Sequence, residues 1–290
     1  MRIIRDEEGL APFHGCVFVP TMGALHEGHG SLIRLARDSA ARSGPRVPVL
    51  VSLFVNPTQF DEAQDFQTYP RDEARDAELC AKWGADAIFA PPVELMYPQG
   101  AAKEPVADLP RVAFAPGLED SWRPGHFAGV VRVCRRLFDL VRPAVAVFGE
   151  KDWQQLQVIR AMVAQDGRPI TIVPGPTVRE PDGLALSSRN VRLNAEERAQ
   201  ARAIPEALVE AGRHTDPASA ERAGRALLER AGFQVEYFAV RDEQTLEPWP
   251  AGRDGRGGRV IVACRTKSTR LIDNAVWPGW TLNGYRPGSP

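Results

Sequence analysis

Short apolar runs alternate with stretches of helical spacing from residue 15 to residue 180, and this alternation constrains the fold more than any other feature of the chain. The run VPVLVSLFVNP (47–57) is apolar almost throughout, which is typical of a strand buried on both faces of a parallel sheet. The stretch FAGVVRVCRRLFDLV (127–141) instead repeats its apolar residues at the spacing of an amphipathic helix. Strands that alternate with helices predict an α/β fold with a mainly parallel sheet and right-handed crossovers.

The same series supplies the other expected elements. The remaining strands are GCVFVP (15–20), ADAIFAP (85–91), AVAVFGEKD (144–152, running into a turn) and ITIVPGPTVRE (170–180). The remaining helices are LIRLARDSAARS (32–43), DEARDAELCAKWG (72–84) and WQQLQVIRAMVAQ (153–165). In parallel sheets, ligands collect at the carboxyl ends of the strands, near a topological switch point. The chemically unusual residues fall at that edge, after Pro20, Val55, Phe148 and Val178.

After residue 190 the composition changes, and the chain becomes rich in Ala, Arg and Glu. We expect helices over 194–214 and 218–232, followed by strands over 233–240 and 258–265. This order predicts a smaller α+β unit. We therefore expect an N-terminal domain over residues 1–176 and a C-terminal domain over residues 177–290.

Charge and cysteine content narrow the class of function. Lys plus Arg total 36 against 37 for Asp plus Glu, so the net charge gives no electrostatic footprint for nucleic acid or an anionic membrane, although it leaves a local basic patch open. The four cysteines form no CxxC pair, which favours buried free thiols in a reducing compartment over a zinc site or a disulfide framework. They are Cys16, Cys80, Cys134 and Cys264. The N-terminal segment lacks the apolar core of a signal peptide, and no stretch is long and apolar enough to span a membrane. We therefore expect a cytoplasmic protein.

The stretch PTMGALHEGHGSL (20–32) places two histidines three residues apart, where a strand should turn into a helix. A helix N-terminus with glycines suits a phosphate, because unpaired N–H groups and the positive end of the dipole face the ligand. His26 and His29 could then donate hydrogen bonds to phosphoryl oxygens as charge develops. Metal ligation is disfavoured, because no third His or Cys is near and the HExxH pattern is absent. Taken alone, HxGH leaves both a phosphate contact and a plain turn or surface position open.

Two further loops carry polar residues that could orient a ligand. FVNPTQF (54–60) puts Asn56 and Gln59 directly beyond a buried strand, although simple Asn–Pro turn chemistry would leave the same sequence. SWRPGHFAGV (121–130) brings Arg123 and His126 together in a Pro/Gly loop before a helix. Taken singly, that loop is equally consistent with a structural role.

Two other stretches offer groups for a chain of phosphates. FGEKDWQQ (148–155) places Lys151 and Asp152 at a strand end, where Lys would neutralise a phosphate and Asp could hold a magnesium-bound water or a hydroxyl. The alternative is a solvated Lys–Asp pair. TVREPDGLALSSRN (177–190) ends in serine hydroxyls and an arginine, which would make a triphosphate clamp on a loop between domains. Alternatively, Ser187 or Ser188 caps a helix that begins after Asn190.

Together, these motifs resemble one family, the pantothenate synthetases (pantoate–β-alanine ligases). The resemblance runs in order through PTMGALHEGHGSL, FVNPTQF, YPRD, RPGHFAGV, FGEKDWQQ and REPDGLALSSRN, and it reaches STRLIDN (268–274). It implies a Rossmann-like nucleotide-binding domain with a smaller α+β C-terminal lid domain. It also implies an ATP-dependent condensation of (R)-pantoate with β-alanine through a pantoyl adenylate, releasing AMP and pyrophosphate. MgATP would be the cosubstrate, and the enzyme would be a homodimer.

The resemblance implies residue roles by position in each motif. The catalytic residues would be His29, His26 and Lys151, with His29 as the donor to phosphoryl oxygens. Gln59 and Gln155 would hold pantoate, Gln59 also near β-alanine, with Asn56, Arg123 and His126 in support. The residues that would line the ATP site are Met22, Gly23, Ala24, Leu25, His26, Glu27, Gly28, His29, Gly149, Glu150, Lys151, Asp152, Val178, Leu186, Ser187, Ser188 and Arg189. No residue is assigned as a direct metal ligand.

Other functions compatible with the motifs stay open beside this one. HxGH alone places the chain only among Rossmann-like nucleotidylyl-transfer enzymes, which include class I aminoacyl-tRNA synthetases. A nucleotidylyltransferase would release pyrophosphate without AMP, and Gln59 and Gln155 weigh against it. A tRNA synthetase lacks support, because no KMSKS-like sequence follows and no basic tRNA surface is indicated. A nucleotide-binding regulator without turnover would keep the same fold, but intact His29 and Lys151 weigh against it.

Overall fold

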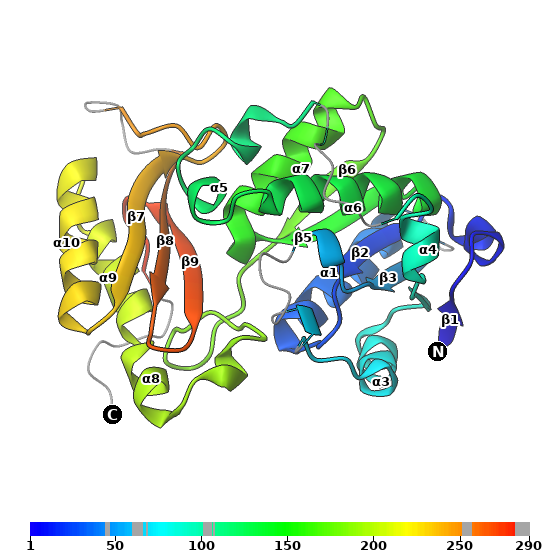
Figure 1. Ribbon diagram of the computed structural model, residues 1–290, viewed down its shortest axis with the longest axis horizontal. Coiled ribbons are helices and arrows are strands. Elements are labelled where there is room, and N and C mark those ends of the chain that lie inside the picture. Colours follow the sequence, from blue (N-terminus) through cyan, green and yellow to red (C-terminus); the bar gives the residue numbers. More distant parts are fainter. Residues whose placement is uncertain are drawn as a thin grey trace. The chain divides into compact units, whose positions relative to one another are not determined.

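The structure is a computed structural model that describes residues 1–43, 47–59, 66–67, 69–100, 106, 108–250 and 257–281. Phe60, the last residue of the FVNPTQF motif, lies outside this range. The chain divides into two compact units (Figure 1). The first unit comprises Met1–Glu150 and Gln154–Pro176, and the second comprises Lys151–Trp153 and Thr177–Pro290.

The first unit is built on a six-stranded parallel sheet of order β1-β4-β3-β2-β5-β6 (Figure 1). Its strands are β1 (Arg2–Ile4), β2 (Val17–Thr21), β3 (Val49–Leu53), β4 (Ala87–Phe89), β5 (Val145–Gly149) and β6 (Thr171–Gly175). The chain runs outward from β2 to β3 and β4, then returns to place β5 on the other side of β2. The topological switch point therefore lies between β2 and β5, where such sheets bind ligands beyond the carboxyl ends of the strands.

Helices cover both faces of this sheet (Figure 1). The helices whose bounds the structure gives in the first unit are α1 (Glu27–Ser43), α3 (Glu73–Trp83), α4 (Val93–Met96), α5 (Glu119–Trp122), α6 (His126–Val141) and α7 (Trp153–Gln165). The first residue of α7, Trp153, belongs to the second unit. The described residues of this part of the chain also form the short 3₁₀ turns η1 (Glu8–Phe13), η2 (Pro57–Gln59), η3 (Arg111–Ala113) and η4 (Glu150–Asp152). Of η4, only Glu150 belongs to the first unit. Right-handed crossovers put α1 and α3 on one face and α7 on the other, because the strand order reverses direction at β2.

The core of the first unit follows from alternate side chains of the buried strands. Val19, Val51 and Ile88 face α1 and α3 and are fully buried. On the opposite face, Phe148 meets Phe138 of α6 edge-on, with ring centroids 6.4 Å apart. The predicted α/β fold with a parallel sheet and a smaller α+β unit is confirmed.

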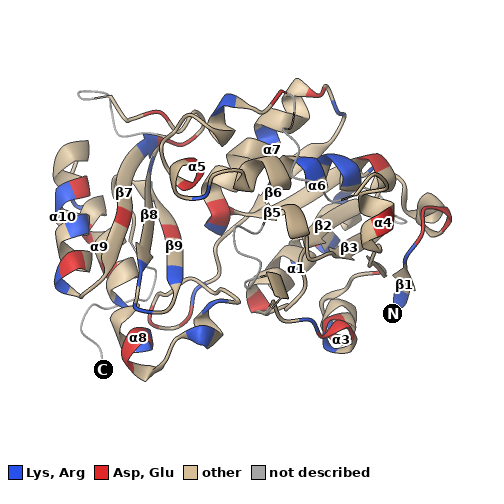
Figure 2. Ribbon diagram, viewed as in Figure 1, with Lys and Arg blue, Asp and Glu red and all other residues tan. Residues whose placement is uncertain are grey.

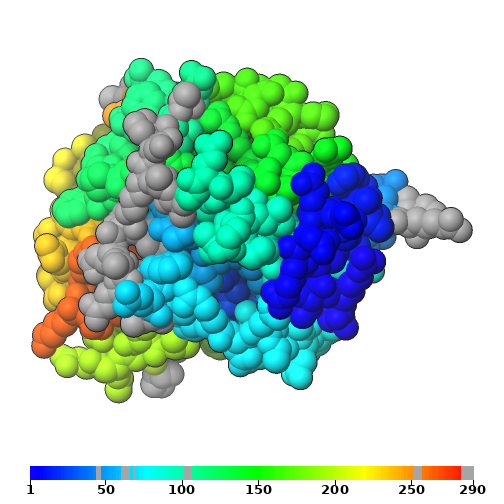
Figure 3. All heavy atoms as spheres, turned by 45° about the vertical axis from the view of Figure 1, so that its right-hand side comes forward, coloured from blue at the N-terminus to red at the C-terminus, as the bar shows by residue number. Residues whose placement is uncertain are grey.

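The N-terminal edge of the sheet differs from expectation. The strand β1, which was not predicted, pairs with β4 in parallel. Arg5 follows it and donates to both carboxylate oxygens of Glu73 at the start of α3, at 2.7 and 2.9 Å. Figure 3 shows this N-terminal segment in dark blue at the surface. A three-residue strand is too short to give a periodic signal, so its sequence does not distinguish it from a loop.

The second unit packs helices against a three-stranded antiparallel sheet (Figure 1). Its strands are β7 (Gln234–Asp242), β8 (Gly258–Arg265) and β9 (Arg270–Trp277). Its helices are η5 (Asn190–Arg192), α8 (Ala195–Gln200), α9 (Ala203–Gly212) and α10 (Pro217–Arg230). Leu208 of α9, Leu228 of α10 and Val262 of β8 are fully buried in one cluster. Basic and acidic residues intermix along α10, as Figure 2 shows.

Three expectations for the second unit need correction. The helix expected over 194–214 is two helices, because Pro205 has no N–H and its ring clashes with the carbonyl four residues earlier. The third strand, β9, was not predicted, since its central Asp273 and Asn274 disfavour strands. Neither Ser187 nor Ser188 caps a helix: η5 has no side-chain cap, and Asn194 caps α8 through the N–H of Glu197 at 2.9 Å.

The cysteines and the helix lengths bear on two further expectations. All four cysteines are buried and free, as predicted. Burial raises the pKa of Cys16, Cys80 and Cys134 to about 12, so these thiols are poor nucleophiles. Within the described ranges, no helix combines the length and the apolar character that crossing a bilayer requires.

Candidate active site

The turn between β2 and α1 carries the HxGH motif and has an unusual backbone. Gly23 and Ala24 both have left-handed backbone angles, with φ of 83° and 53°. Gly23 adopts this conformation at little cost, whereas Ala24 is strained by its Cβ. The tight turn explains why α1 begins at Glu27, five residues before the expected start of the helix at residue 32.

His26 and His29 cap the N-terminus of α1 reciprocally. His26 is the N-cap residue, and its Nδ1 accepts the N–H of Gly28 at 3.1 Å. His29, three residues later, accepts the N–H of His26 at its own Nδ1 at 3.3 Å. The two rings lie 4.2 Å apart. This arrangement is a variant of the capping box made from two imidazoles, in which the N-cap side chain accepts the second rather than the third helical N–H, and it accounts for the spacing of three residues.

The capping bonds also fix where each ring carries its hydrogen. A backbone N–H can only donate, so Nδ1 of both His26 and His29 must be the unprotonated acceptor. The ring hydrogen of each neutral imidazole therefore resides on Nε2. Both histidines can present Nε2–H as a donor near a helix N-terminus, which is an arrangement suited to a phosphate.

Asp76, which was not singled out from the sequence, holds this turn from α3. Its carboxylate accepts the N–H groups of Ala24 and Leu25, each at 2.9 Å. Only 2% of Asp76 is exposed. The available signal was periodicity: Asp76, Cys80 and Trp83 share one helix face, and a charged residue on a buried face is unusual.

The turn after β3 is organised around Asn56, which is 1% exposed. Its Nδ2 donates to Gln59 Oε1 at 3.0 Å and to the carbonyl of Gly129 at 3.1 Å. Its Oδ1 accepts from the Thr58 hydroxyl at 2.9 Å and from Tyr97 Oη. Gln59 Nε2 in turn reaches Met22 Sδ at 3.2 Å. The FVNPTQF turn and the HxGH turn are therefore brought together at this sheet edge.

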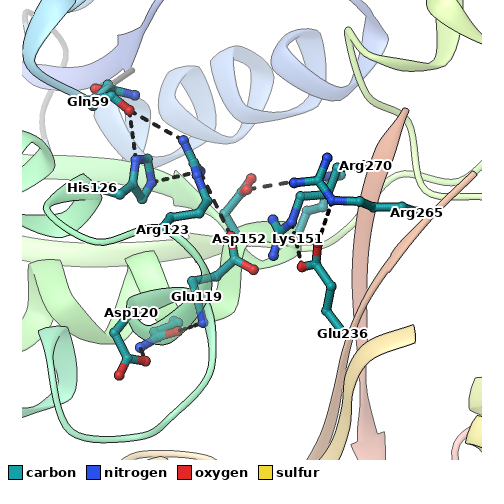
Figure 4. Close-up of polar contacts among 11 residues, drawn as sticks. Gln59, Glu119, Asp120, Arg123, His126, Lys151, Asp152, Glu236, Arg265 and Arg270 are labelled. Carbon is teal, nitrogen blue, oxygen red and sulfur yellow. Dashed lines mark hydrogen bonds and ion pairs between the residues drawn. The ribbon is translucent and has the colours of Figure 1, made fainter. Parts of the chain in front are cut away.

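The RPGHF loop adds a second support for Gln59 (Figure 4). His126 Nδ1 lies 3.0 Å from the Gln59 carbonyl, and Arg123 donates to the same oxygen at 3.3 Å. Arg123 also lies 3.1 Å from His126 Nε2. Because a carbonyl only accepts and a guanidinium only donates, His126 must be neutral with its hydrogen on Nδ1. Behind Arg123, the carboxylate of Glu119 lies at 3.8 Å.

The end of β5 and the start of α7 supply the remaining candidates of the first unit. Gly149 lies beside α1, where an added Cβ would sit 3.7 Å from Leu32. Gln154, also missed from the sequence, is buried and bonds the start of α5: it accepts the N–H of Glu119 at 3.0 Å and donates to Asp120 at 2.9 Å. Glu150 and Gln155 are half-buried.

Lys151 and Asp152 belong to the second unit, where the segment 151–153 packs on the sheet of β7, β8 and β9. Asn274 of β9 donates to the carbonyl of Lys151 at 2.9 Å. Trp153 donates to the Glu243 carbonyl at 2.9 Å, and its ring stacks on the guanidinium of Arg259. Lys151 Nζ lies 4.0 Å from Asp152. On the same sheet, Glu236 pairs with Arg265 and Arg270 at 2.6 and 2.7 Å (Figure 4).

The segment 178–190 of the second unit folds back on itself. Leu186 donates its N–H to the Val178 carbonyl at 2.9 Å. Asn190 Nδ2 donates to Glu180 at 2.9 Å and to the carbonyl of Ala185 at 3.0 Å. Ser187 Oγ accepts the N–H of Arg189 at 3.2 Å. Val178 lies three residues beyond the end of β6 rather than at the strand end itself, because β6 stops at Gly175.

The chemical resources of these residues are hydrogen-bond donors, amides and cations rather than a metal cage. Within the part of the chain that the structure describes, no group of three or more His, Cys, Asp or Glu side chains could hold a metal ion. The first unit brings Met22–His29, Asn56, Gln59, Arg123 and His126 into one contact network. Such a network can bind an anion and orient a polar ligand beside it.

Comparisons with known proteins agree on one family. A family model described as pantoate-beta-alanine ligase matches residues 3–276. The pantothenate synthetase of Rhodopseudomonas palustris is 46% identical over 260 residues, which cover 88% of each chain. The pantothenate synthetase of Thermobifida fusca is 45% identical over 284 residues and covers 94% of this chain and 93% of the relative.

Solved structures give the same result. Pantothenate synthetase from Thermus thermophilus superimposes with a TM-score of 0.84 at 45% identity, covering 96% of this chain and 100% of the other. A pantoate-beta-alanine ligase from Francisella tularensis, in complex with Beta-gamma ATP and beta-alanine, has a TM-score of 0.77 at 31% identity and covers 95% of this chain and 97% of the other. By sequence and by structure, this chain belongs to the pantoate-beta-alanine ligase family.

Proposed function

We propose that this protein condenses pantoate with β-alanine at the expense of ATP. In the first step, a pantoate carboxylate oxygen attacks the α-phosphorus of ATP, the bond from that phosphorus to the bridging oxygen breaks, and pyrophosphate leaves. In the second step, the amine of β-alanine attacks the activated carbonyl, AMP leaves, and the amine loses its proton. The products are pantothenate, AMP and pyrophosphate.

The observation that carries the proposal is the reciprocally capped histidine pair at the start of α1. Attack on the α-phosphorus accumulates negative charge on phosphoryl oxygens, which oriented donors stabilise. His26 and His29 hold Nδ1 on backbone N–H groups and so carry the ring hydrogen on Nε2. His29 donates to those oxygens in the transition state, and His26 assists it.

The other ATP contacts are assigned from the family motifs. Lys151 neutralises the phosphates with its ammonium group. Val178 contacts the adenine. The turns Met22–His29 and Gly149–Asp152 line the nucleotide. The residues Leu186–Arg189 close on the triphosphate as a clamp.

The amides Gln59 and Gln155 hold pantoate, and Gln59 also contacts β-alanine. The support around Gln59 favours this role, because Asn56 fixes its side chain while His126 and Arg123 fix its carbonyl. A side chain held on both sides loses little further entropy when it binds a ligand.

Magnesium enters with the nucleotide in this proposal. The described residues offer no cluster of ligands for a protein-held ion, and Mg²⁺ commonly binds mainly through substrate phosphates and water. Asp152 could hold one of those waters. When bound, the ion supplies charge neutralisation on the phosphates.

Product analysis tests the proposal. Purified protein supplied with ATP, Mg²⁺, pantoate and β-alanine should form pantothenate and AMP in equal amounts, and omission of either the acid or the amine should prevent this. Pyrophosphate release without AMP would indicate a nucleotidylyltransferase instead. ATP binding without any pyrophosphate release would indicate a regulator without turnover.

We further propose that residues 1–176 form the catalytic domain and residues 177–290 a lid domain, in a cytoplasmic homodimer. The resemblance to the family supports these assignments. Sedimentation equilibrium of the full chain should give twice the monomer mass of 31.8 kDa, and a monomeric mass across the concentration range would contradict the dimer.

A further inference from the structure

The HxGH turn is strained in a way that needs an external support. Gly23 and Ala24 are left-handed in succession, and a left-handed non-glycine residue costs free energy that the surrounding structure must supply. The histidine caps begin only at His26 and so do not restrain the two peptides before it. Another group must therefore hold the N–H groups of Ala24 and Leu25.

Asp76 is that group. Its Oδ2 accepts the N–H of Ala24 and its Oδ1 the N–H of Leu25, both at 2.9 Å. The fit is close, because a Cβ added to Gly23 would lie 3.0 Å from Asp76 Oδ2. Each carboxylate oxygen serves one of two successive peptides, so the carboxylate fixes the orientation of both.

The base of this support is itself rigidly placed. On the same face of α3, Cys80 and Trp83 are buried in the core cluster with Ile33 of α1. A Cβ on Gly30 of α1 would lie 2.5 Å from the Trp83 ring, so the two helices pack without any side chain at this position. The packing of α3 against α1 therefore fixes the position of Asp76 relative to the two histidines.

The peptide orientation that Asp76 fixes affects the two histidine rings through the backbone. The peptide that Asp76 orients at Leu25 is followed directly by His26, whose N–H bonds His29 Nδ1. A shift of this turn would tilt both the cap and the two Nε2 donors. Catalytic donors lose much of their effect when displaced by about 1 Å.

We propose that Asp76 is a positioning residue for the adenylation step, acting through the backbone of residues 24–25 to aim the histidine pair. This inference rests on the proposed function. Burial raises the pKa of Asp76, while the N–H groups of Leu25 and Ala24 lower it. The ionised carboxylate presents both oxygens as acceptors, one to each N–H. The amide of asparagine cannot replace it, because its oxygen accepts one N–H and its NH₂ opposes the other.

The test is D76N, measured in the two half-reactions separately. Pantoate-dependent exchange of pyrophosphate into ATP reports adenylation, and release of pantothenate from supplied pantoyl adenylate and β-alanine reports aminolysis. Adenylation should fall on the order of 10- to 100-fold, whereas aminolysis should fall less than about threefold, because it involves no pyrophosphate leaving group. The KM for pantoate should stay within about threefold of wild type.

The matched control is D86N. Asp86 also accepts a backbone N–H in the first unit, from Val49 at 2.7 Å, but at the opposite, amino end of β3. D86N should leave both half-reactions within about twofold of wild type. Equal loss of both half-reactions in D76N, or unchanged adenylation, would overturn the inference. If wild-type protein lacks pantoate-dependent exchange, it is the proposed function that fails.

A measurement on the wild type keeps the inference testable if D76N does not fold. The amides of Ala24 and Leu25 should exchange with deuterium at least about tenfold more slowly than unprotected loop amides. Exchange of both amides at the rate of an exposed loop would show that Asp76 does not restrain the turn, and would overturn the proposal.

Discussion

The proposed substrate-binding segments of the two units are held by different kinds of contact. The HxGH and FVNPTQF turns of the first unit are held by buried side chains that bond backbone groups, with Asp76 2% and Asn56 1% exposed. In segment 178–190 of the second unit, Arg179 forms a buried ion pair with Asp273, whereas Glu180 and Asp182 are held by partly exposed ion pairs. Arg198 lies 2.6 Å from both Glu180 and Asp182, and these three side chains are 20 to 29% exposed.

The two kinds of contact differ in the free energy that is needed to disturb them. Buried polar groups that are fully paired are costly to disturb, because each lost partner leaves an unsatisfied group away from water. Partly exposed ion pairs are weaker and are screened by salt. Firm turns suit groups that must be aimed at a reacting phosphorus, whereas weaker anchoring suits a clamp that must change its contacts when ligand binds.

The largest expected effect concerns the HxGH turn of the first unit, which is held by buried contacts. H29A should lower the adenylation rate about 10²- to 10³-fold, because an oriented donor to the developing oxyanion is lost. Pantoate binding should change far less. The comparison of single-turnover adenylation with pantoate affinity checks this, and equal losses in both would count against a transition-state role.

Substitution of Asn56 tests how strongly the buried contacts of the first unit contribute to the free energy of unfolding. N56A removes the partner of Gln59, Gly129, Thr58 and Tyr97 at once, so we expect a loss of roughly 3 kcal/mol in the free energy of unfolding. Y97F removes only one of these donors and should cost roughly 1 kcal/mol. Urea unfolding of both variants measures the difference. If N56A cost no more than Y97F, the turn would not depend on its buried hub.

These expectations also show what the sequence could and could not predict. Long periodic elements such as α6, and the chemistry of the motifs, could be read directly because period and residue type carry that information. Asp76 was missed because its importance comes from two backbone groups more than 50 residues away. No local pattern encodes such a contact, although a carboxylate beside Cys80 and Trp83 on one helix face was a hint.

The second unit was harder to predict for a related reason. β9 contains Asp273 and Asn274, which local propensity places in loops. Tertiary pairing overrides that preference: Arg179 binds the Asp273 carboxylate at 2.6 Å, and Arg259 donates to Asn274. The division of 194–214 into α8 and α9 follows from Pro205, which interrupts the helical hydrogen bonds of the preceding turn.

Glu197 is a buried carboxylate of the second unit, and it contrasts with the partly exposed ion pairs of Arg198. Glu197 accepts from Thr266 Oγ1 at 2.7 Å and from Ser268 Oγ at 2.8 Å, and the hydroxyls of Thr266 and Ser268 lower its pKa from 4.5 to about 2. Because the folded pKa is depressed, the stabilisation is present above pH 4.5 and is lost as the pH falls toward 2.

E197Q should therefore lower the melting temperature by several degrees at neutral pH, less than N56A does. The gap between wild type and E197Q should narrow as the pH falls below 4.5. E196Q, at the exposed neighbouring position, is the matched control and should leave the melting temperature nearly unchanged. A gap that stays constant with pH would show that Glu197 acts through packing rather than charge.

The smallest expected effect is on the ion pairs that Arg198 forms with segment 178–190. R198K keeps the charge but replaces a fork that reaches Glu180 and Asp182 together with a point donor. Because these groups are partly exposed, we expect a loss of no more than about 1 kcal/mol, shrinking further in high salt. R202K is the control, since Arg202 lies farther from Asp182, at 3.4 Å, and is half-exposed. Urea unfolding at low and high salt measures both variants. A loss in R198K as large as that in N56A, and insensitive to salt, would show that segment 178–190 is anchored as firmly as the two turns of the first unit.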